Sequence, residues 1–215
     1  MTAKELKQEF ITFFEKRGHK KLSNFSLIPK DDPTTLFISA GIQPLVPYFL
    51  GKPHSLGKRL VSVQRCLRTV DIEEVGDAFH HTFFEMLGNW SLGDYWKKES
   101  LAWSLEFLTK VLALDPKRLH VTIFAGDKKT PKDEEAEKVW LSLGIPKERI
   151  YALPRKQNWW EVGQTGPGGP DSEIFYDWGL PACGPDCQPG DNCERFMEIW
   201  NNVFMEYNKT TDGKY

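Results

Sequence analysis

The sequence predicts an α+β fold in which a mainly antiparallel sheet is flanked by helices. Apolar residues recur at helical spacing in several stretches, and strand-like runs lie between and after them at uneven intervals. Strands that alternated regularly with helices would instead favour a doubly wound parallel sheet. With 215 residues, of which 40% are hydrophobic, the chain is long enough to bury a substantial core.

Three stretches have the pattern of amphipathic helices. The first begins at a capping box formed by Thr2 and Glu5, and its apolar stripe consists of Leu6, Phe10, Phe13 and Phe14. The second starts near Lys98, with the stripe Leu101, Leu105, Leu108 and Leu112. The third is expected over residues 134–143, with Trp140 and Leu143 facing inward.

Strands are expected in six runs, which are residues 35–39, 60–64, 82–87, 119–124, 173–177 and 194–207. Two segments rich in glycine and proline, 41–58 and 154–170, are expected to be irregular. Residues 208–213 have the composition of a hairpin turn, yet no return strand follows them. We therefore expect the chain to be part of a longer protein.

Composition excludes several classes of protein. The net charge of −2 provides no general positive field for nucleic acid. No run reaches the roughly 20 apolar residues of a membrane span, and charged residues interrupt the N-terminus before any signal-peptide core. The four cysteines do not resemble a secreted disulfide framework. We expect a cytoplasmic protein without a membrane partner.

Cationic side chains flank the loop between the strands expected at 60–64 and 82–87. Arg65 and Arg68 follow the first strand, and His80 and His81 precede the second. The chain has no P-loop motif, but a guanidinium fork matches two phosphate oxygens, so an anion pocket is one interpretation. Surface ion pairs of the arginines with Asp71, Glu73 or Glu74 are the alternative. The two histidines should point to opposite faces of a strand, so at most one can serve a pocket.

Two tryptophans are candidates to stack on a purine ring, because flat aromatic faces suit bases. Trp90 follows the histidines, and Trp160 precedes Gly163, Gly166, Gly168 and Gly169. Glycines allow a backbone to approach a ligand closely, although a flexible loop is the competing interpretation. For both tryptophans, the alternative role is to fill a core.

Three of the four cysteines, Cys183, Cys187 and Cys193, lie in one late segment rich in glycine and proline. Clusters of thiols in an intracellular protein suggest Zn²⁺, but a structural zinc site requires four ligands. Asp177, Asp186 or Asp191 would complete such a site, and free thiols are the alternative.

Taken together, these segments resemble the alanyl-tRNA synthetases, a family of class II aminoacyl-tRNA synthetases, over essentially the whole chain. Residues 80–95 are similar to the family's second signature, and Gln64-Arg65-Cys66-Leu67-Arg68 precedes it as in the family. Its first signature is similar to residues 26–33 and 37–41. The segments 158–170 and Glu198-Ile199-Trp200-Asn201-Asn202-Val203-Phe204-Met205 complete the pattern.

The resemblance implies ATP-dependent activation of L-alanine and its transfer to tRNA(Ala), with Mg²⁺ accompanying ATP. By resemblance, Arg68 would hold the α-phosphate and His81 would contact the phosphates as the catalytic pair. Trp90 would lie near the adenine, and the nucleotide and amino-acid pocket would be lined by Trp160, Ile199, Trp200 and Asn201. Asn201 would also contact alanine, with Val203 limiting the pocket to a methyl group.

The sequence departs from the family pattern in two places. Gly168 replaces a cysteine that is common in the family, and the chain stops before the third signature, which completes the ATP site. We therefore expect residues 1–215 to be an incomplete class II catalytic domain, without the tRNA-recognition and editing domains. The alternative is a non-catalytic, synthetase-like module that binds a nucleotide or a protein.

Overall fold

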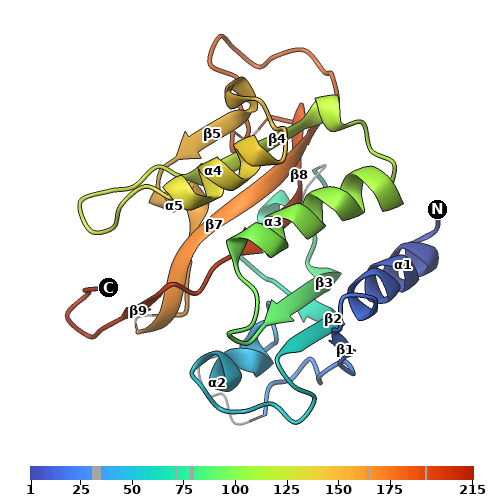
Figure 1. Cartoon of the computed structure of the whole chain (residues 1–215), viewed down its shortest axis with the longest axis vertical. Helices are drawn as coiled ribbons and strands as arrows, with labels where there is room; N and C mark the ends of the chain where they lie inside the picture. Colours follow the sequence, from blue (N-terminus) through green and yellow to red (C-terminus); the bar gives the residue numbers. More distant parts are fainter. Residues whose placement is uncertain (31–34, 71, 78–79, 164, 192) are drawn as a thin grey trace. The chain divides into compact units, whose positions relative to one another are not determined.

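The computed structural model describes residues 1–215 except 31–34, 71, 78–79, 164 and 192. The chain divides into two compact units, Met1–Asp94 and Tyr95–Tyr215, whose elements are labelled in Figure 1. Within the described ranges, none of the helices combines the length and the apolar character that crossing a bilayer requires.

The first unit begins with α1 (Ala3–Glu15), whose expected capping box is confirmed. The Thr2 hydroxyl accepts a hydrogen bond from the Glu5 amide (3.2 Å), and the Glu5 carboxylate accepts one from the Thr2 amide (2.7 Å). These bonds satisfy amides that the first helical turn leaves unpaired. The apolar stripe is buried as expected, at Phe10, Ile11, Phe13 and Phe14.

A three-stranded sheet follows, in the order β1 (Lys20–Lys21), β2 (Arg59–Leu67) and β3 (Phe83–Ser91). The antiparallel pair β2–β3 contains both expected strands, and its register places Arg65 opposite Glu85. The short helices η1 (Gln43–Leu45) and α2 (Val46–Phe49) lie within the segment that was expected to be irregular, and η2 spans Ile72–Glu74.

The strand expected at residues 35–39 does not form, and the structure describes this whole range. The side chain of Gln43 accepts hydrogen bonds from the amides of Ser39 (2.6 Å) and Ala40 (3.3 Å), which turns the backbone out of an extended path. Ile38 makes two backbone hydrogen bonds: its amide donates to the Leu27 carbonyl, and its carbonyl accepts from the Leu67 amide. These two bonds do not make the continuous series that a strand would form.

The second unit holds a six-stranded sheet around the long strand β7 (Gly166–Asp177). One half of β7 pairs with β4 (Leu119–Phe124) and β8 (Phe196–Val203), and the other half pairs with β6 (Trp159–Glu161) and β9 (Tyr207–Lys209). These pairs are antiparallel, while β5 (Ile150–Leu153) runs parallel to β4. The prediction of a mainly antiparallel sheet with helices is confirmed.

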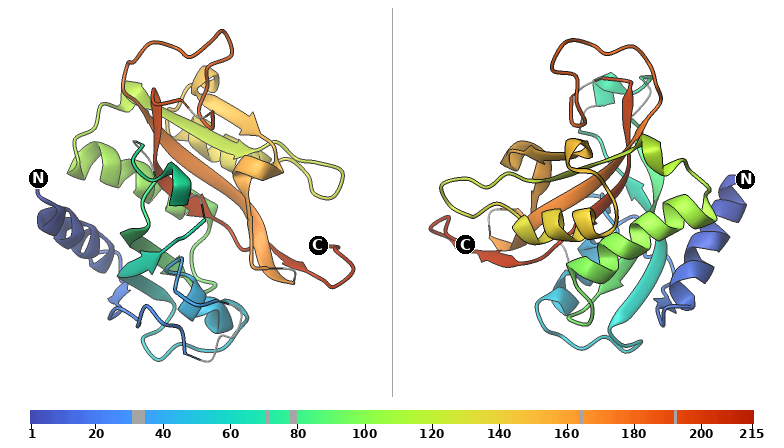
Figure 2. Two further views of the ribbon diagram at one scale, coloured as in Figure 1. Left: turned by 180° about the vertical axis from the view of Figure 1, so that it is seen from behind. Right: turned by 45° about the horizontal axis from the view of Figure 1, so that its top comes forward.

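Helices α3 (Lys97–Glu106) and α4 (Glu134–Ser142) lie against one face of this sheet (Figures 1 and 2). The π-helical turn η3 (Phe107–Val111) continues α3, so the expected second helix is confirmed. Trp140, fully buried, packs with Leu101 and Ile174 in the core and donates its indole N–H to the Ser172 hydroxyl at 2.8 Å. The shorter elements are η4 (Pro116–Arg118), η5 (Lys147–Arg149) and α5 (Arg155–Asn158).

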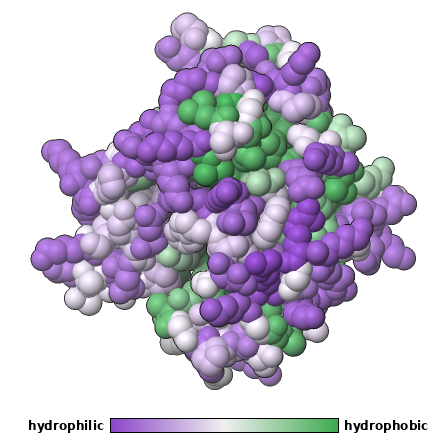
Figure 3. All heavy atoms as spheres, viewed as in Figure 1, coloured by the Kyte–Doolittle hydropathy of each residue, from purple (hydrophilic) through white to green (hydrophobic). Residues whose placement is uncertain are grey.

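Polar side chains dominate the surface on the side seen in Figure 1. In the space-filling view, hydrophobic residues gather in patches near the top and the bottom of that view and hydrophilic residues cover most of the remainder (Figure 3). In α4, for example, the Glu134–Lys138 ion pair lies on the exposed face, whereas Ala136 and Trp140 are buried. The amphipathic pattern in the sequence therefore sets which face of the helix packs on the sheet.

Two strand expectations near the end of the chain are wrong in their extent. Residues 154–170, expected to be irregular, contain α5, β6 and the start of β7, so β7 is much longer than the expected strand at 173–177. The expected strand at 194–207 is divided into β8 and β9. The break falls where the Phe204 amide bonds to the Pro170 carbonyl and the Glu206 amide bonds to the Phe204 carbonyl, which forms a turn.

Candidate functional site

Arg68, immediately after β2, is exposed but held in place. Its amide donates to the Thr82 carbonyl (2.8 Å), its Nε donates to the Ser39 carbonyl (3.0 Å), and its guanidinium carbon lies 5.2 Å from the centre of the Phe84 ring. The two terminal nitrogens make no hydrogen bond to any residue in the described part of the chain. An anchored guanidinium whose fork is not engaged by any described residue is suited to a phosphate.

Arg65 is exposed on the same hairpin. The expected alternative for it, an ion pair with Glu73 or Glu74, is not formed within the described ranges, and Asp71 lies outside them. Its cross-strand neighbour Glu85 is paired with Lys7 at 2.6 Å. Only Arg68 of the two arginines has the fixed orientation that a binding residue requires.

The two histidines precede β3 instead of lying within it, so the expectation that they point to opposite faces of a strand is wrong. His80 is engaged by carboxylates: its Nδ1 lies 2.6 Å from Asp77, and its Nε2 lies 3.6 Å from Glu74. His81 is exposed, with no hydrogen bond to a described residue. Of the two, His81 is therefore the one available to a ligand.

Trp90, on β3, is half-buried and packs within its own unit. Its indole N–H donates to the Ser62 hydroxyl (3.0 Å), and its ring covers Gly88 so closely that a Cβ there would come within 2.3 Å of it. The ring adjoins a cluster built on Leu22, Leu45 and Leu60. The structure thus gives Trp90 a packing role, while its proposed place near an adenine stays a prediction.

The register of the second sheet gathers several side chains on one face. Trp160 lies opposite Gly169, Val203 opposite Asp171, and Asn201 opposite Glu173. Directly paired residues of antiparallel strands share a face, and alternate residues along β7 share it too. Trp160, Asp171, Glu173, Asn201 and Val203 therefore share the face opposite to that of Ser172, which packs on Trp140.

Trp200 lies on the other face, where its ring is 5.8 Å from that of Phe107 and packs on the helical core. Ile199 is also partly packed on this core, at the irregularity where the β7–β8 register shifts. Asn201 and Trp200 consequently point away from each other, so they do not line the same side of the sheet.

Two buried carboxyl groups, Asp171 and Glu173, occupy the face that carries Asn201. Asp171 accepts from the Asn158 amide (3.0 Å), and Glu173 accepts from the Thr122 hydroxyl (3.2 Å) and the Asn201 amide (3.4 Å). Burial raises the pKa of Asp171 to about 7. Burial, together with the neighbouring carboxyl groups of Glu198 and Asp171, raises the pKa of Glu173 to about 9.

These carboxyl groups were missed by sequence reasoning, although a signal existed. Asp171 and Glu173 are two residues apart in β7, next to the buried apolar residues Ile174 and Phe175. Buried carboxyl groups without a cation are unfavourable as anions, so the pair is suited to binding a positively charged ligand or metal ion.

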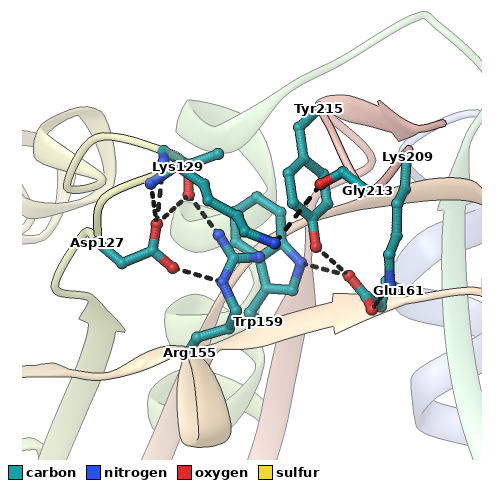
Figure 4. Close-up of polar contacts among 9 residues, drawn as sticks. Asp127, Lys129, Arg155, Trp159, Glu161, Lys209, Gly213 and Tyr215 are labelled. Carbon is teal, nitrogen blue, oxygen red and sulfur yellow. Dashed lines mark hydrogen bonds and ion pairs between the residues drawn. The ribbon is translucent and has the colours of Figure 1, made fainter. Parts of the chain in front are cut away.

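On the other side of β6, Trp159 belongs to a network that ties together distant segments (Figure 4). The guanidinium of Arg155 stacks 3.8 Å from the centre of its indole ring and donates Nε to Asp127 at 2.6 Å. Glu161 accepts from the Trp159 indole (3.2 Å) and from the Tyr215 hydroxyl (2.6 Å). This network holds β6, and with it Trp160, in a fixed orientation.

The cysteines Cys183, Cys187 and Cys193 come together in the connection between β7 and β8, with their sulfur atoms all within 4.8 Å of one another. Asp177, expected as a further ligand, is instead bound by Arg195 through two hydrogen bonds of 3.1 and 2.8 Å. Cys66, the fourth cysteine, is buried on β2 in the first unit.

Comparison with known proteins gives consistent matches. The family model described as tRNA synthetases class II (A) matches residues 5–215. The alanine–tRNA ligases of Treponema denticola and Treponema pallidum are 56% and 53% identical to this chain, over 100% and 99% of it and 36% of each relative. That of Rubrobacter xylanophilus is 48% identical over 99% of the chain and 25% of the relative. The chain spans about a third of the length of the first two of these relatives.

Proposed function

The chain belongs to the class II tRNA synthetase family, and we propose that it forms the ATP- and alanine-binding part of the catalytic core of an alanine–tRNA ligase. In the proposed reaction, the carboxylate of L-alanine attacks the α-phosphorus of ATP and expels pyrophosphate, and the alanyl group then passes to tRNA(Ala) in the cytoplasm. The observation that carries the proposal is the sheet face formed by Trp160, Asp171, Glu173, Asn201 and Val203.

This face has the groups that a small amino acid requires. The exposed amide of Asn201 would hydrogen-bond alanine, and the partly exposed side chain of Val203 would bound the space for its methyl group. Trp160 offers a flat apolar surface to the adenylate. Specificity by this arrangement comes from steric exclusion of larger side chains.

The buried carboxyl groups fit the Mg²⁺ that accompanies ATP, because Mg²⁺ prefers oxygen ligands and a bound cation would offset the cost of ionising two carboxyl groups whose pKa values are raised by burial and by neighbouring carboxyl groups. We assign Asp171 and Glu173 as its candidate ligands. When bound, Mg²⁺ neutralises charge on the phosphates. The contribution of the chain itself is to hold the two carboxyl groups through Asn158 and Thr122.

Arg68 and His81 are the candidate phosphate-binding residues. Because Arg68 is anchored through Nε, its terminal nitrogens are oriented before the phosphate arrives and would offset the charge that grows on the α-phosphate in the transition state. Holding the reacting groups in line accounts for the rest of catalysis, since no covalent intermediate with the protein is needed.

A chimaera tests the proposal, with this chain replacing the matching segment of the Treponema denticola ligase. We expect alanine-dependent ATP–pyrophosphate exchange and aminoacylation of tRNA(Ala), both sharply reduced by Asn201→Ala. A folded chimaera without exchange would contradict the proposal. ATP binding to the chain with no preference for L-alanine would favour the alternative, a non-catalytic nucleotide-binding module.

A further inference from the structure

The connection between β7 and β8, residues 178–195, lacks an apolar core of its own. Of its described residues, only Pro189 and Cys193 are buried, and the large side chains of Trp178 and Leu180 are 49% and 44% exposed. Loops of this length inside a compact unit are uncommon unless they are functional or held by something other than apolar packing. The connection nevertheless has a defined course.

Hydrogen bonds join the two ends of the connection where it leaves and re-enters the sheet. Arg195 binds the carboxylate of Asp177 through two hydrogen bonds, and the Trp178 amide donates to the Arg195 carbonyl at 2.8 Å. Two turns then fold the interior: the Cys187 amide donates to the Gly184 carbonyl (3.3 Å) and the Cys193 amide to the Asp191 carbonyl (2.7 Å). As a result, the three thiols, which lie within eleven positions of the sequence, converge on one point.

The spacing of these thiols matches a metal site. A tetrahedral zinc ion with Zn–S bonds of about 2.3 Å separates its sulfur ligands by about 3.8 Å. The sulfur atoms of Cys187 and Cys193 are 3.7 Å apart, and those of all three cysteines lie within 4.8 Å of one another. A disulfide would join only two of the three sulfurs and requires a much shorter S–S distance than the one observed.

We propose that Cys183, Cys187 and Cys193 bind a zinc ion as thiolates and that this ion holds the β7–β8 connection together. The three thiols supply three corners of the tetrahedron. Cys183 is exposed, so the fourth corner opens to solvent, and a water molecule there completes the set of four ligands that the ion requires. Binding releases the thiol protons, and the ion replaces the apolar core that the connection lacks. This site does not depend on the proposed ligase function.

Cobalt and zinc titration of the reduced full chain tests the proposal, because Co²⁺ bound to thiolates in a tetrahedral site absorbs strongly in the near ultraviolet and the visible. We expect about one Co²⁺ per chain, displaced by about one Zn²⁺. Cys183→Ser, Cys187→Ser and Cys193→Ser should each weaken binding at least about tenfold, since even changes outside the ligand shell cost this much. Cys66→Ala is the matched control and should bind as the natural chain does.

Cys193 is buried, so Cys193→Ser can lose metal binding simply because it impairs folding. Cys183 is exposed, so Cys183→Ser disturbs no buried contact and tests metal binding in a folded chain. Absence of the thiolate absorption in the folded natural chain would overturn the proposal. So would an unchanged metal affinity in Cys183→Ser. A Cys187–Cys193 disulfide that persists, by mass spectrometry, in chain kept with reductant and Zn²⁺ would also overturn it.

Discussion

At the scale of single residues, the buried carboxyl group of Glu173 makes the stability of the protein depend on pH. Its pKa is raised from 4.5 to about 9 in the folded protein. The folded state therefore retains a proton that the unfolded chain has already released, so the free energy of unfolding falls as the pH rises from 4.5 towards about 9. Asp171, whose pKa is raised to about 7, adds to the same trend at lower pH.

Glu173→Gln removes this titration, so its free energy of unfolding should fall less steeply with pH and exceed that of the natural chain at about pH 8.5. Urea unfolding at a series of pH values measures this. Glu148→Gln, at an exposed position, is the control and should leave the slope unchanged. Equal slopes in the natural chain and Glu173→Gln would contradict the assignment of a raised pKa to Glu173.

Arg68 is the second residue whose environment predicts a measurable effect. Arg68→Ala should lower the rate of ATP–pyrophosphate exchange by about 10²–10³-fold in the chimaera, the loss typical of a removed group that stabilises transition-state charge. Arg68→Lys should recover only part of the rate, because an ammonium lacks the fork that binds two oxygens. Lys21→Ala, an exposed change in the same unit, serves as the control. An exchange rate above half of normal in Arg68→Ala would exclude it from phosphate binding.

At the scale of elements, the close approach of strand β7 to the turn between β8 and β9 depends on a residue without a side chain. A Cβ at Gly169 would lie 2.0 Å from the Phe204 carbonyl oxygen and 2.9 Å from the Glu206 amide nitrogen. Gly169→Ala must therefore separate β7 from this turn, which should lower the free energy of unfolding by about 1–3 kcal/mol.

Gly184→Ala is the matched control for this change, since a Cβ there would meet nothing within 4 Å. Urea unfolding should place it within about 0.5 kcal/mol of the natural chain. If Gly169→Ala is equally neutral, the segment after β8 does not pack on β7 as the structure shows.

Elements with a local sequence signal could be predicted, whereas the strand that depends on Gly168 and Gly169 could not. The helix at Ala3–Glu15 and the hairpin β2–β3 carry their own capping and periodicity signals, so local pattern suffices for them. The sequence predicts an irregular segment at residues 154–170, because glycine and proline usually disfavour strands. Here Gly168 and Gly169 are what permits neighbouring backbone to approach β7, and only the tertiary structure shows this.

Strand register in the second sheet assembles the candidate alanine-binding face from residues far apart in the sequence. Asn201 and Val203 could be named from the sequence through resemblance, but their neighbours Asp171 and Glu173 could not. The link between them is a pairing of residues about 30 positions apart, which local pattern does not encode. For the cysteines the sequence offered three ligands, and the folded connection then removed Asp177 as a fourth by pairing it with Arg195.

Selection of alanine over glycine sets a limit on what this sheet face can do. Val203 and Asn201 would exclude larger side chains by steric clash, but glycine is smaller than alanine and enters the same space. The loss of one methyl contact is worth about 1–3 kcal/mol, so kcat/KM for glycine activation in the chimaera should fall only about 10–200-fold below that for alanine. ATP–pyrophosphate exchange with each amino acid measures this ratio. L-2-aminobutyrate, one methylene larger than alanine, should have a still lower kcat/KM than glycine, because it clashes with Val203. Val203→Ala should bring kcat/KM for L-2-aminobutyrate closer to that for alanine and leave the ratio of kcat/KM for alanine to that for glycine nearly unchanged. A discrimination against glycine above about 10⁴-fold in exchange would require polar groups that reject glycine, and side chains of this face could not supply it by contact with a methyl group alone.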